Sequence, residues 1–182
     1  KSVRFRHPRE ACDARIAMVT EDRKRLSLFP DLDVAGNVSL CSLGDALRGG
    51  LLSRRREEAL VAGPIRETGV KTPGPHAAIT GLSGGNQQKC IIGRWLLTRP
   101  RVLLLDDPTR GIDVGAKAEL YALIDGLCRE GLGVILTSSE LPELLTLADR
   151  IIVLAEGRLT GEFSRAEATE QKIVEEIGRA HV

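Results

Sequence analysis

The distal part of the chain alternates between short apolar runs and longer amphipathic segments. The apolar runs are uninterrupted, which is typical of strands buried on both faces of a parallel sheet. They predict strands over 102–105, 134–137 and 151–154. The segments around them predict helices over 83–97, 115–129, 141–147 and 165–176. Strict alternation of strand and helix predicts a parallel sheet with helices on its faces.

The proximal part follows a different pattern. Ile16–Val19 is an apolar run that predicts a strand, and it ends at the charged cluster Glu21–Arg25. Helical spacing recurs over 37–47 and 54–68, with glycine, proline and basic residues between, and predicts a helical subdomain. A further turn at Glu156-Gly157 predicts a hairpin into a strand over 158–163. The fold class is therefore α/β, a parallel sheet flanked by helices plus a helical subdomain.

These elements predict four regions. We expect a core remnant over 1–29, the helical subdomain over 30–82, a distal core over 83–165 and a C-terminal helix with tail over 166–182. The last six residues, from Ile177 to Val182, continue no periodic pattern, and we expect them to be translated adapter sequence.

Composition excludes several classes of protein. The 182 residues carry 26 basic and 25 acidic side chains, so no global field favours nucleic acid. The four cysteines are scattered without CxxC spacing, which argues against a zinc site or a disulfide framework. No apolar stretch approaches the roughly 20 residues that a membrane span needs.

A glycine-rich helix start is the first candidate for chemistry. Ser83 precedes Gly84 and Gly85, so a hydroxyl and backbone amides converge at the positive end of a helix dipole. This arrangement predicts an anion site. The alternative is a helix cap followed by flexible glycines.

Two carboxylates follow the predicted strand over 102–105. A carboxylate at the carboxyl end of a parallel strand lies where such sheets bind ligands, so Asp106 is a candidate Mg²⁺ ligand. Asp107 beside it is placed to polarise an attacking water. The alternative is that both residues cap a turn. The sequence holds no GxxxxGK[ST] loop, so we expect a fragment that lacks the main phosphate cradle.

The motifs taken together resemble those of ABC ATPases, from about Ile16 to Glu176. Residues 82–89 (LSGGNQQK) resemble the signature motif, and residues 103–113 (LLLDDPTRGID) resemble the Walker B strand and D-loop. More narrowly, EDRK at 21–24, TRGIDVGAK at 109–117 and SSELPE at 138–143 resemble the second ATP-binding half of monosaccharide importers of the ribose, galactose and xylose type.

The resemblance implies a role for each matching residue, with ATP and Mg²⁺ as cofactors. In this family two domains sandwich ATP, and the signature motif of one domain caps the γ-phosphate held by the other. Asp106 would hold Mg²⁺ and Asp107 would be catalytic for this domain's own nucleotide. Asp113 would couple the two sites, and Glu21 and Ser138 would stand near the nucleotide. The residues implied to serve the partner's ATP are Leu82, Ser83, Gly84, Gly85, Asn86 and Gln87.

Three of these residues depart from the general ABC pattern. Glu21 replaces the Q-loop glutamine, and Ser138 replaces the switch histidine, whose imidazole a serine cannot mimic. Asp107 replaces the catalytic glutamate and withdraws the carboxylate by roughly 1 Å. We therefore expect this domain's own site to be slow or inactive, and the isolated chain to bind ATP weakly without hydrolysing it.

The resemblance also implies partners. These are another ATP-binding half, transmembrane permease subunits and, indirectly, a periplasmic sugar-binding protein, with no nucleic acid among them. It places the protein peripherally at the cytoplasmic face of the inner membrane. Two alternatives are a soluble ABC protein that acts on ribosomes or DNA, and a regulatory half that binds ATP without cleaving it.

Overall fold

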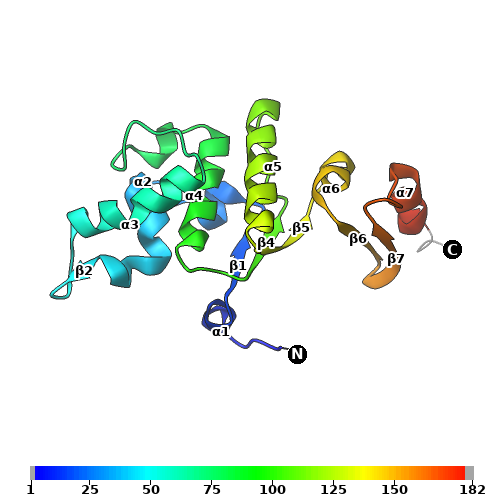
Figure 1. Ribbon diagram of the computed structural model, residues 1–182, viewed down its shortest axis with the longest axis horizontal. Coiled ribbons are helices and arrows are strands. Elements are labelled where there is room, and N and C mark those ends of the chain that lie inside the picture. The colour runs from blue at the N-terminus through cyan, green and yellow to red at the C-terminus, as the bar shows by residue number, and fades with distance from the viewer. Residues whose placement is uncertain (1–2, 179–182) are drawn as a thin grey trace. The chain divides into compact units, whose positions relative to one another are not determined.

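The computed structural model describes residues 3–178 and divides the chain into two compact units (Figure 1). The first unit extends to Ile135 and the second begins at Leu136. Each unit has its own apolar core.

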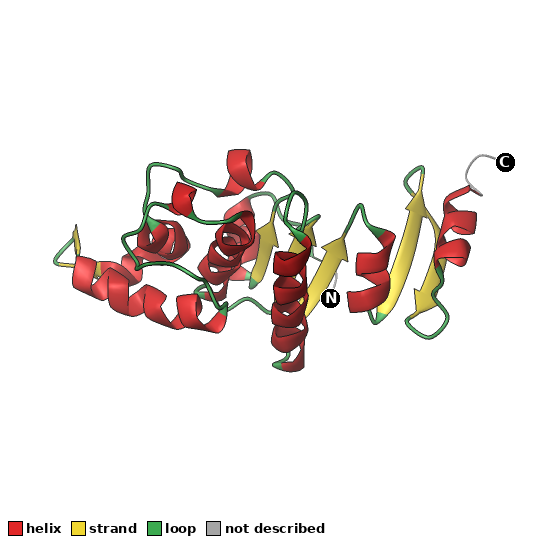
Figure 2. Ribbon diagram, turned by 90° about the horizontal axis from the view of Figure 1, so that it is seen from above, coloured by secondary structure: helices red, strands yellow, loops and turns green. Residues whose placement is uncertain are grey.

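A three-stranded sheet in the order β1-β4-β5 forms the centre of the first unit (Figure 2). β1 spans Ile16–Val19, β4 spans Val102–Asp106 and β5 spans Gly133–Thr137. β1 and β4 run parallel, with Ile16 opposite Val102 and Val19 opposite Leu105. This confirms the predicted parallel pairing of β1 with β4, the strand that ends in Asp106.

The expectation that both faces of these strands are buried is wrong. Along β4, Leu103 and Leu105 are buried, whereas Leu104 between them is only partly covered. Met18 of β1 is 45% exposed and Ile135 of β5 is 61% exposed. The described helices cover one face of the strands and leave these apolar side chains open.

Helices build most of the remaining first unit. α2 spans Val34–Ser39 and continues into a 3-10 turn over Leu40–Ala46. It begins earlier than predicted because the Asp33 carboxylate accepts a hydrogen bond from the Gly36 amide, at 2.8 Å, and caps the helix. α3 spans Arg54–Glu67, as predicted.

A small hairpin that the sequence pattern does not predict joins these two helices. β2 spans Leu47–Arg48 and β3 spans Leu51–Leu52. The intervening Gly49 and Gly50 both have positive φ, which glycine adopts without strain.

α4, the helix that follows the glycine-rich turn, spans Gly84–Leu96, and a short 3-10 turn over Ile79–Gly81 precedes it. Its Cys90 packs into one apolar cluster with α2 and α3, so α4 shares a core with the predicted helical subdomain. The buried members of this cluster are Val34, Ala35, Val38, Val61, Ile79 and Cys90.

Three further elements complete the first unit. α5 spans Val114–Arg129, close to its predicted range. A short α1 over Pro8–Asp13 and a π-helical turn over Arg23–Ser27 were not predicted. The π-turn begins where the Asp22 carboxylate accepts a hydrogen bond from the Arg25 amide, at 3.1 Å.

The second unit packs two helices on a hairpin. α6 spans Leu141–Leu147, β6 Arg150–Ala155, β7 Arg158–Ser164 and α7 Glu170–Gly178. β6 pairs antiparallel with β7, whereas the sequence analysis grouped it with the parallel strands. The predicted turn is confirmed, since Glu156 and Gly157 both have positive φ.

The start of α7 lies later than the predicted residue 165. The Ser164 hydroxyl donates to the Glu167 carboxylate at 2.5 Å, and this local turn delays the helix to Glu170. Of the tail, Ile177 and Gly178 end α7, while Arg179–Val182 lie outside the described residues. Within the part of the chain that is described, no helix is both long and apolar enough to cross a membrane.

Candidate functional site

The carboxyl ends of β1 and β4 bring three predicted site residues to one edge of the sheet. Because Val19 lies opposite Leu105, Glu21 and Asp107 each stand two positions beyond a paired residue of adjacent parallel strands. Asp106 ends β4 itself and is partly buried. This is the edge at which parallel sheets bind ligands.

Asp107 has an unusual backbone. Its φ is +44°, in the left-handed region that few residues other than glycine, asparagine and aspartate adopt. The chain therefore turns sharply directly after Asp106, and the two neighbouring carboxylates are carried on backbones of different conformation.

The donors at this edge are carboxylate oxygens, the ligand type that Mg²⁺ takes from proteins. Among the described residues, no three His, Cys, Asp or Glu side chains gather closely enough to bind a metal ion together. Mg²⁺ in nucleotide sites commonly takes one or two carboxylates, with phosphate and water supplying the rest. The single carboxylate of Asp106 fits that pattern.

Glu21 pairs with a residue of the segment that resembles the D-loop. Its carboxylate forms an ion pair with the Arg110 guanidinium, and both side chains are exposed to solvent. The end of β1 is therefore tied through Glu21 to the segment that follows β4. Such an exposed pair contributes little to stability, at most about 1 kcal/mol.

Asp113 acts as the N-cap of α5. Its Oδ1 accepts a hydrogen bond from the Ala116 amide at 2.9 Å. Gly111, two residues earlier, has a φ of +67°, which allows the chain to turn from Pro108 toward the helix.

The glycine-rich turn places Ser83 on the surface at the N-cap of α4, without a side-chain capping bond. The Ser83 hydroxyl oxygen accepts instead from the Asn86 amide nitrogen at 3.0 Å. Gly84 lies beneath Arg23, because a methyl group at Gly84 would stand 2.9 Å from a guanidinium nitrogen of that residue. A cation thus lies beside the amides of the helix start.

Leu82 and Gln87 point inward rather than toward the helix start. Leu82 packs against the apolar cluster of α2, α3 and α4. The Gln87 amide nitrogen donates to the Ile79 carbonyl at 3.2 Å. Of the six residues in the predicted contact with a partner's ATP, only Ser83 to Asn86 lie at the helix start.

Ser138 belongs to the second unit. Its hydroxyl donates to the buried carboxylate of Glu143 on α6, and its oxygen accepts from the Glu140 amide at 3.0 Å. Within its own unit, the residue at the predicted switch position is therefore engaged with the start of α6.

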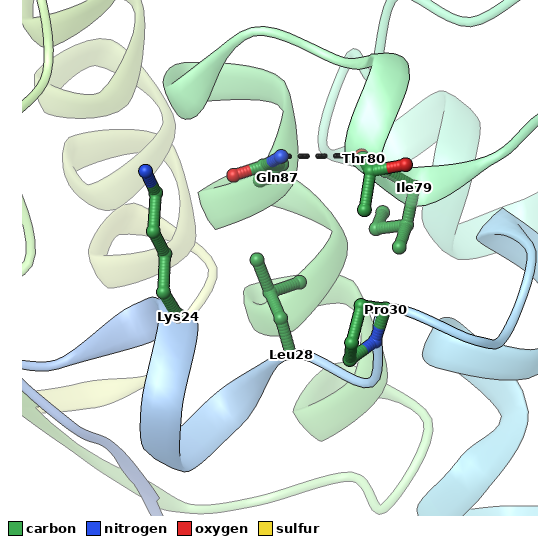
Figure 3. Close-up of a pocket in the computed structure, with 6 residues that line it drawn as sticks. All are labelled: Lys24, Leu28, Pro30, Ile79, Thr80 and Gln87. Atoms are coloured by element: carbon green, nitrogen blue, oxygen red, sulfur yellow. Dashed lines mark hydrogen bonds between the residues drawn. The ribbon is translucent and has the colours of Figure 1, made fainter.

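A pocket of about 310 Å³ lies between the π-turn and α4 (Figure 3). One wall comes from residues 24–30, which begin at the last residue of the EDRK cluster, and the other comes from the turn before α4 and from the first turn of α4. The lining residues are Lys24, Leu28, Pro30, Ile79, Thr80 and Gln87. Leu26 and Phe29, in the same segment as the first wall, are exposed large apolar side chains.

Arg94 of α4 fixes the segment that forms the first wall, and sequence reasoning missed it. Its guanidinium donates to the Ser27 carbonyl at 2.7 Å and to the Asn37 carbonyl at 2.5 Å, and it lies 5.4 Å from the Phe29 ring centroid. Burial lowers the pKa of Arg94. Nothing in the local pattern marks this arginine, because its partners are backbone carbonyls distant in sequence.

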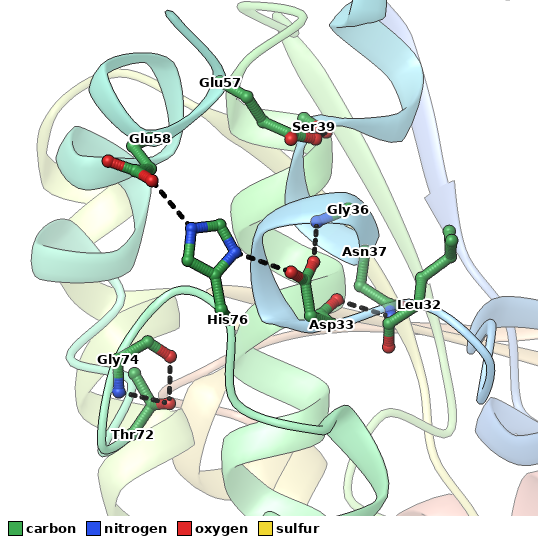
Figure 4. A network of polar contacts seen from close by, with 10 residues as sticks. All are labelled: Leu32, Asp33, Gly36, Asn37, Ser39, Glu57, Glu58, Thr72, Gly74 and His76. Carbon is green, nitrogen blue, oxygen red and sulfur yellow. Dashed lines mark hydrogen bonds and ion pairs between the residues drawn. The ribbon is translucent and has the colours of Figure 1, made fainter. Parts of the chain in front are cut away.

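His76 was missed for the same reason. Its ring joins the start of α2 to α3, with Nδ1 2.7 Å from Asp33 and Nε2 2.7 Å from Glu58 (Figure 4). The hydrogen bond with Glu58 and then that with Asp33 raise the pKa of His76.

Comparison with known proteins gives these features a family. The family model described as ABC transporter matches residues 2–110, which is more than half of the chain. The chain belongs to the ABC transporter family. The matched region of this ABC chain includes the segments that resemble the signature motif and the Walker B strand, and it ends within the segment that resembles the D-loop.

Two curated relatives illustrate the match. The chain is 49% identical over 175 residues to the ribose import ATP-binding protein RbsA of Rhodopirellula baltica, and 46% identical over 174 residues to the xylose import ATP-binding protein XylG of Moorella thermoacetica. Each alignment covers 96% of this ABC chain and 34% of the relative. The chain thus spans about a third of the length of these relatives.

Solved structures support the fold. The ATP-binding cassette MJ0796, in a dimeric post-hydrolysis state bound to ADP and Pi, matches with a TM-score of 0.70 and 23% identity. The match covers 88% of this ABC chain and 68% of that chain. The fold class predicted from the sequence, that of an ABC ATPase, is confirmed.

Proposed function

We propose that this chain is part of the second ATP-binding half of a sugar importer, and that its signature turn completes an ATP site held by a partner half. The observation that carries the proposal is the surface position of Ser83 at the N-terminus of the 13-residue α4. The hydroxyl, the following amides and the helix dipole all favour a phosphate at this place. The sugar-import names of the relatives support the class of cargo.

The site on this chain's own Walker B strand is proposed to be slow or inactive. Asp106 would hold Mg²⁺, whose role when bound is to neutralise phosphate charge. Asp107 carries a shorter carboxylate than the usual glutamate, and Glu21 is ion-paired with Arg110. A chain with these departures is expected to contribute more through its signature turn than through its own carboxylates.

The pocket beside the π-turn is the proposed contact for a permease subunit. Its walls are mostly apolar, Lys24 is among the lining residues, and the exposed Leu26 and Phe29 belong to the same segment. An apolar groove of this kind suits an amphipathic helix. Docking there would hold the protein peripherally at the cytoplasmic face of the inner membrane.

Substitution of Ser83 in the full-length protein tests the signature role. Ser83→Ala should lower ATP turnover about 10²-fold, the usual loss when one donor to a developing charge is removed. Asp107→Asn should change turnover less than twofold, because the active site lies elsewhere. Ser53→Ala is the matched control, since Ser53 is also an N-cap without a side-chain capping bond.

A larger loss of ATP turnover in Asp107→Asn than in Ser83→Ala would contradict the proposed function. If Asp107→Asn abolishes turnover and Ser83→Ala does not, catalysis depends on this chain's own site. If neither variant changes turnover while ATP still binds, the chain is a regulatory half.

A bulky residue in the pocket tests permease docking. Thr80→Trp should release the full-length protein from membranes that contain its permease, because the indole fills the pocket. Glu67→Trp, at an exposed position near the end of α3, is the control. Equal retention of both variants on the membranes would exclude the pocket as the docking site.

A further inference from the structure

We propose that Asn86 is a positioning residue that fixes the direction of the Ser83 hydroxyl, so that this hydroxyl donates to a phosphate oxygen. The inference deepens the proposed function and rests on it. It names how the serine is prepared for an anion, which the motif alone does not state.

The orientation of the Asn86 amide follows from its other partner. The Lys71 backbone amide, which can only donate, lies 2.8 Å from Asn86 Oδ1. The oxygen end of the side chain therefore faces Lys71, and the nitrogen end faces Ser83. At 3.0 Å, Asn86 Nδ2 donates to Ser83 Oγ.

This polarity decides what the serine can do. A side-chain amide nitrogen is a donor only, so the Ser83 oxygen acts as acceptor in this contact. Its single hydrogen is then directed away from Asn86. A phosphate oxygen is an acceptor with negative charge, and a hydroxyl already accepting one hydrogen bond donates more strongly to it.

The Lys71 amide is itself held in place by charged contacts. Lys71 Nζ lies 2.6 Å from one oxygen of Glu119 on α5, and the buried Lys89 Nζ lies 2.6 Å from the other. Lys89 also donates to the Gly69 carbonyl at 3.2 Å. The loop that orients Asn86 is thus fastened to both α4 and α5.

Asn86→Asp in the full-length protein separates this role from simple packing. The aspartate has nearly the same shape, but its carboxylate accepts the Ser83 hydrogen instead of donating to the oxygen. ATP turnover should then fall about 10²-fold, as far as in Ser83→Ala. Asn86→Ala leaves the hydroxyl free to rotate and should lose only about tenfold, the equivalent of one hydrogen bond.

The double variant Ser83→Ala/Asn86→Asp separates two explanations for a slow Asn86→Asp variant. Either the aspartate misdirects the Ser83 hydroxyl, or its carboxylate repels the phosphate directly. If Asn86 acts through Ser83, the double variant turns over at the rate of Ser83→Ala alone. A further tenfold loss in the double variant would overturn the inference, because it would show that the carboxylate repels the phosphate directly. Wild-type turnover in Asn86→Asp would also overturn it.

One further measurement and a comparison of the two single variants keep the outcomes separate. The thermal midpoint of each variant should stay close to that of the wild type, since the changed contacts lie at the surface. If Ser83→Ala itself retains full turnover, the proposed function fails, and the positioning role of Asn86, which rests on it, fails with it. If Ser83→Ala is slow and Asn86→Asp is not, only the positioning role fails.

Discussion

Gly85 of the signature turn lies directly against Ala116 in the first turn of α5. A methyl group at Gly85 would stand 2.6 Å from the Ala116 Cβ, closer than any normal contact between carbon atoms. The start of the signature helix and the start of the helix that follows the D-loop therefore pack without space between them. Packing against Ala116 therefore requires glycine at this position.

Substitution of Gly85 by alanine should destabilise the chain by overpacking. We expect Gly85→Ala to lower the free energy of unfolding by about 1–3 kcal/mol, as measured by urea unfolding. Ala116→Gly removes the opposing methyl group, and alone it should cost about 1 kcal/mol. The double variant should be more stable than Gly85→Ala alone. If the two losses simply add, the close contact is not the cause.

Removal of Arg94 should destabilise the helical part of the first unit. Arg94→Ala leaves the carbonyls of Ser27 and Asn37 without their buried donor, and we expect a loss of about 2–4 kcal/mol in urea unfolding. Arg101→Ala is the control, because that side chain is exposed and its loss should stay within about 0.5 kcal/mol. Similar losses in both variants would refute a structural role for Arg94.

The His76 contacts should make stability depend on pH. The pKa of His76 is raised in the folded chain from an ordinary value of 6.5. Protonated His76 interacts with Asp33 and Glu58, while Arg54 opposes the charge. The stabilisation is therefore complete below pH 6.5 and is lost as pH rises through the raised pKa.

Urea unfolding at a series of pH values measures this dependence. The wild-type midpoint should fall from about pH 6.5 upward, and His76→Gln should remove that fall. His7→Gln is the control, because it leaves Asp33 and Glu58 untouched. The same slope in wild type and His76→Gln would assign the pH dependence to other groups.

The contribution of the Glu119 contacts to stability should change with pH in the opposite direction, so that it is lost as pH falls. Hydrogen bonds from Lys71 and then from Lys89 lower the pKa of Glu119 to about 2, from 4.5. Its contribution is present above pH 4.5 and is lost as pH falls toward 2. Glu119→Gln should lower the urea midpoint at pH 6, and the difference from wild type should shrink as pH falls. Glu130→Gln, an exposed residue at the end of α5, should show no such difference.

The sequence predicted the secondary structure of this chain better than its long-range contacts. Ile16–Val19 and the strand that ends in Asp106 could be recognised because apolar runs and turn residues act locally. Arg94 and His76 could not, because each is defined by partners that are dozens of positions away. β6 was grouped with the wrong sheet because an apolar run does not specify which strand it pairs with.

In the candidate site, too, features set by local sequence could be predicted, whereas features set by distant partners could not. The exposed Ser83 and the capping Asp113 follow from local motifs. The inward direction of Gln87 does not, because it depends on the Ile79 carbonyl of the preceding turn. The pairing of Glu21 with Arg110 required the parallel register of two strands that lie far apart in sequence.

The left-handed backbone at Asp107 limits which residues can evolve at that position. With a φ of +44°, glycine, asparagine and aspartate fit with little strain, whereas a β-branched residue would cost roughly 1–2 kcal/mol or more. A library of all residues at this position, selected only for folded protein, should therefore return these three side chains most often. Glu156 adopts a similar φ of +50° in the same chain, so the turn admits a longer acidic side chain, and the reach of the carboxylate at position 107 is set by the aspartate side chain itself.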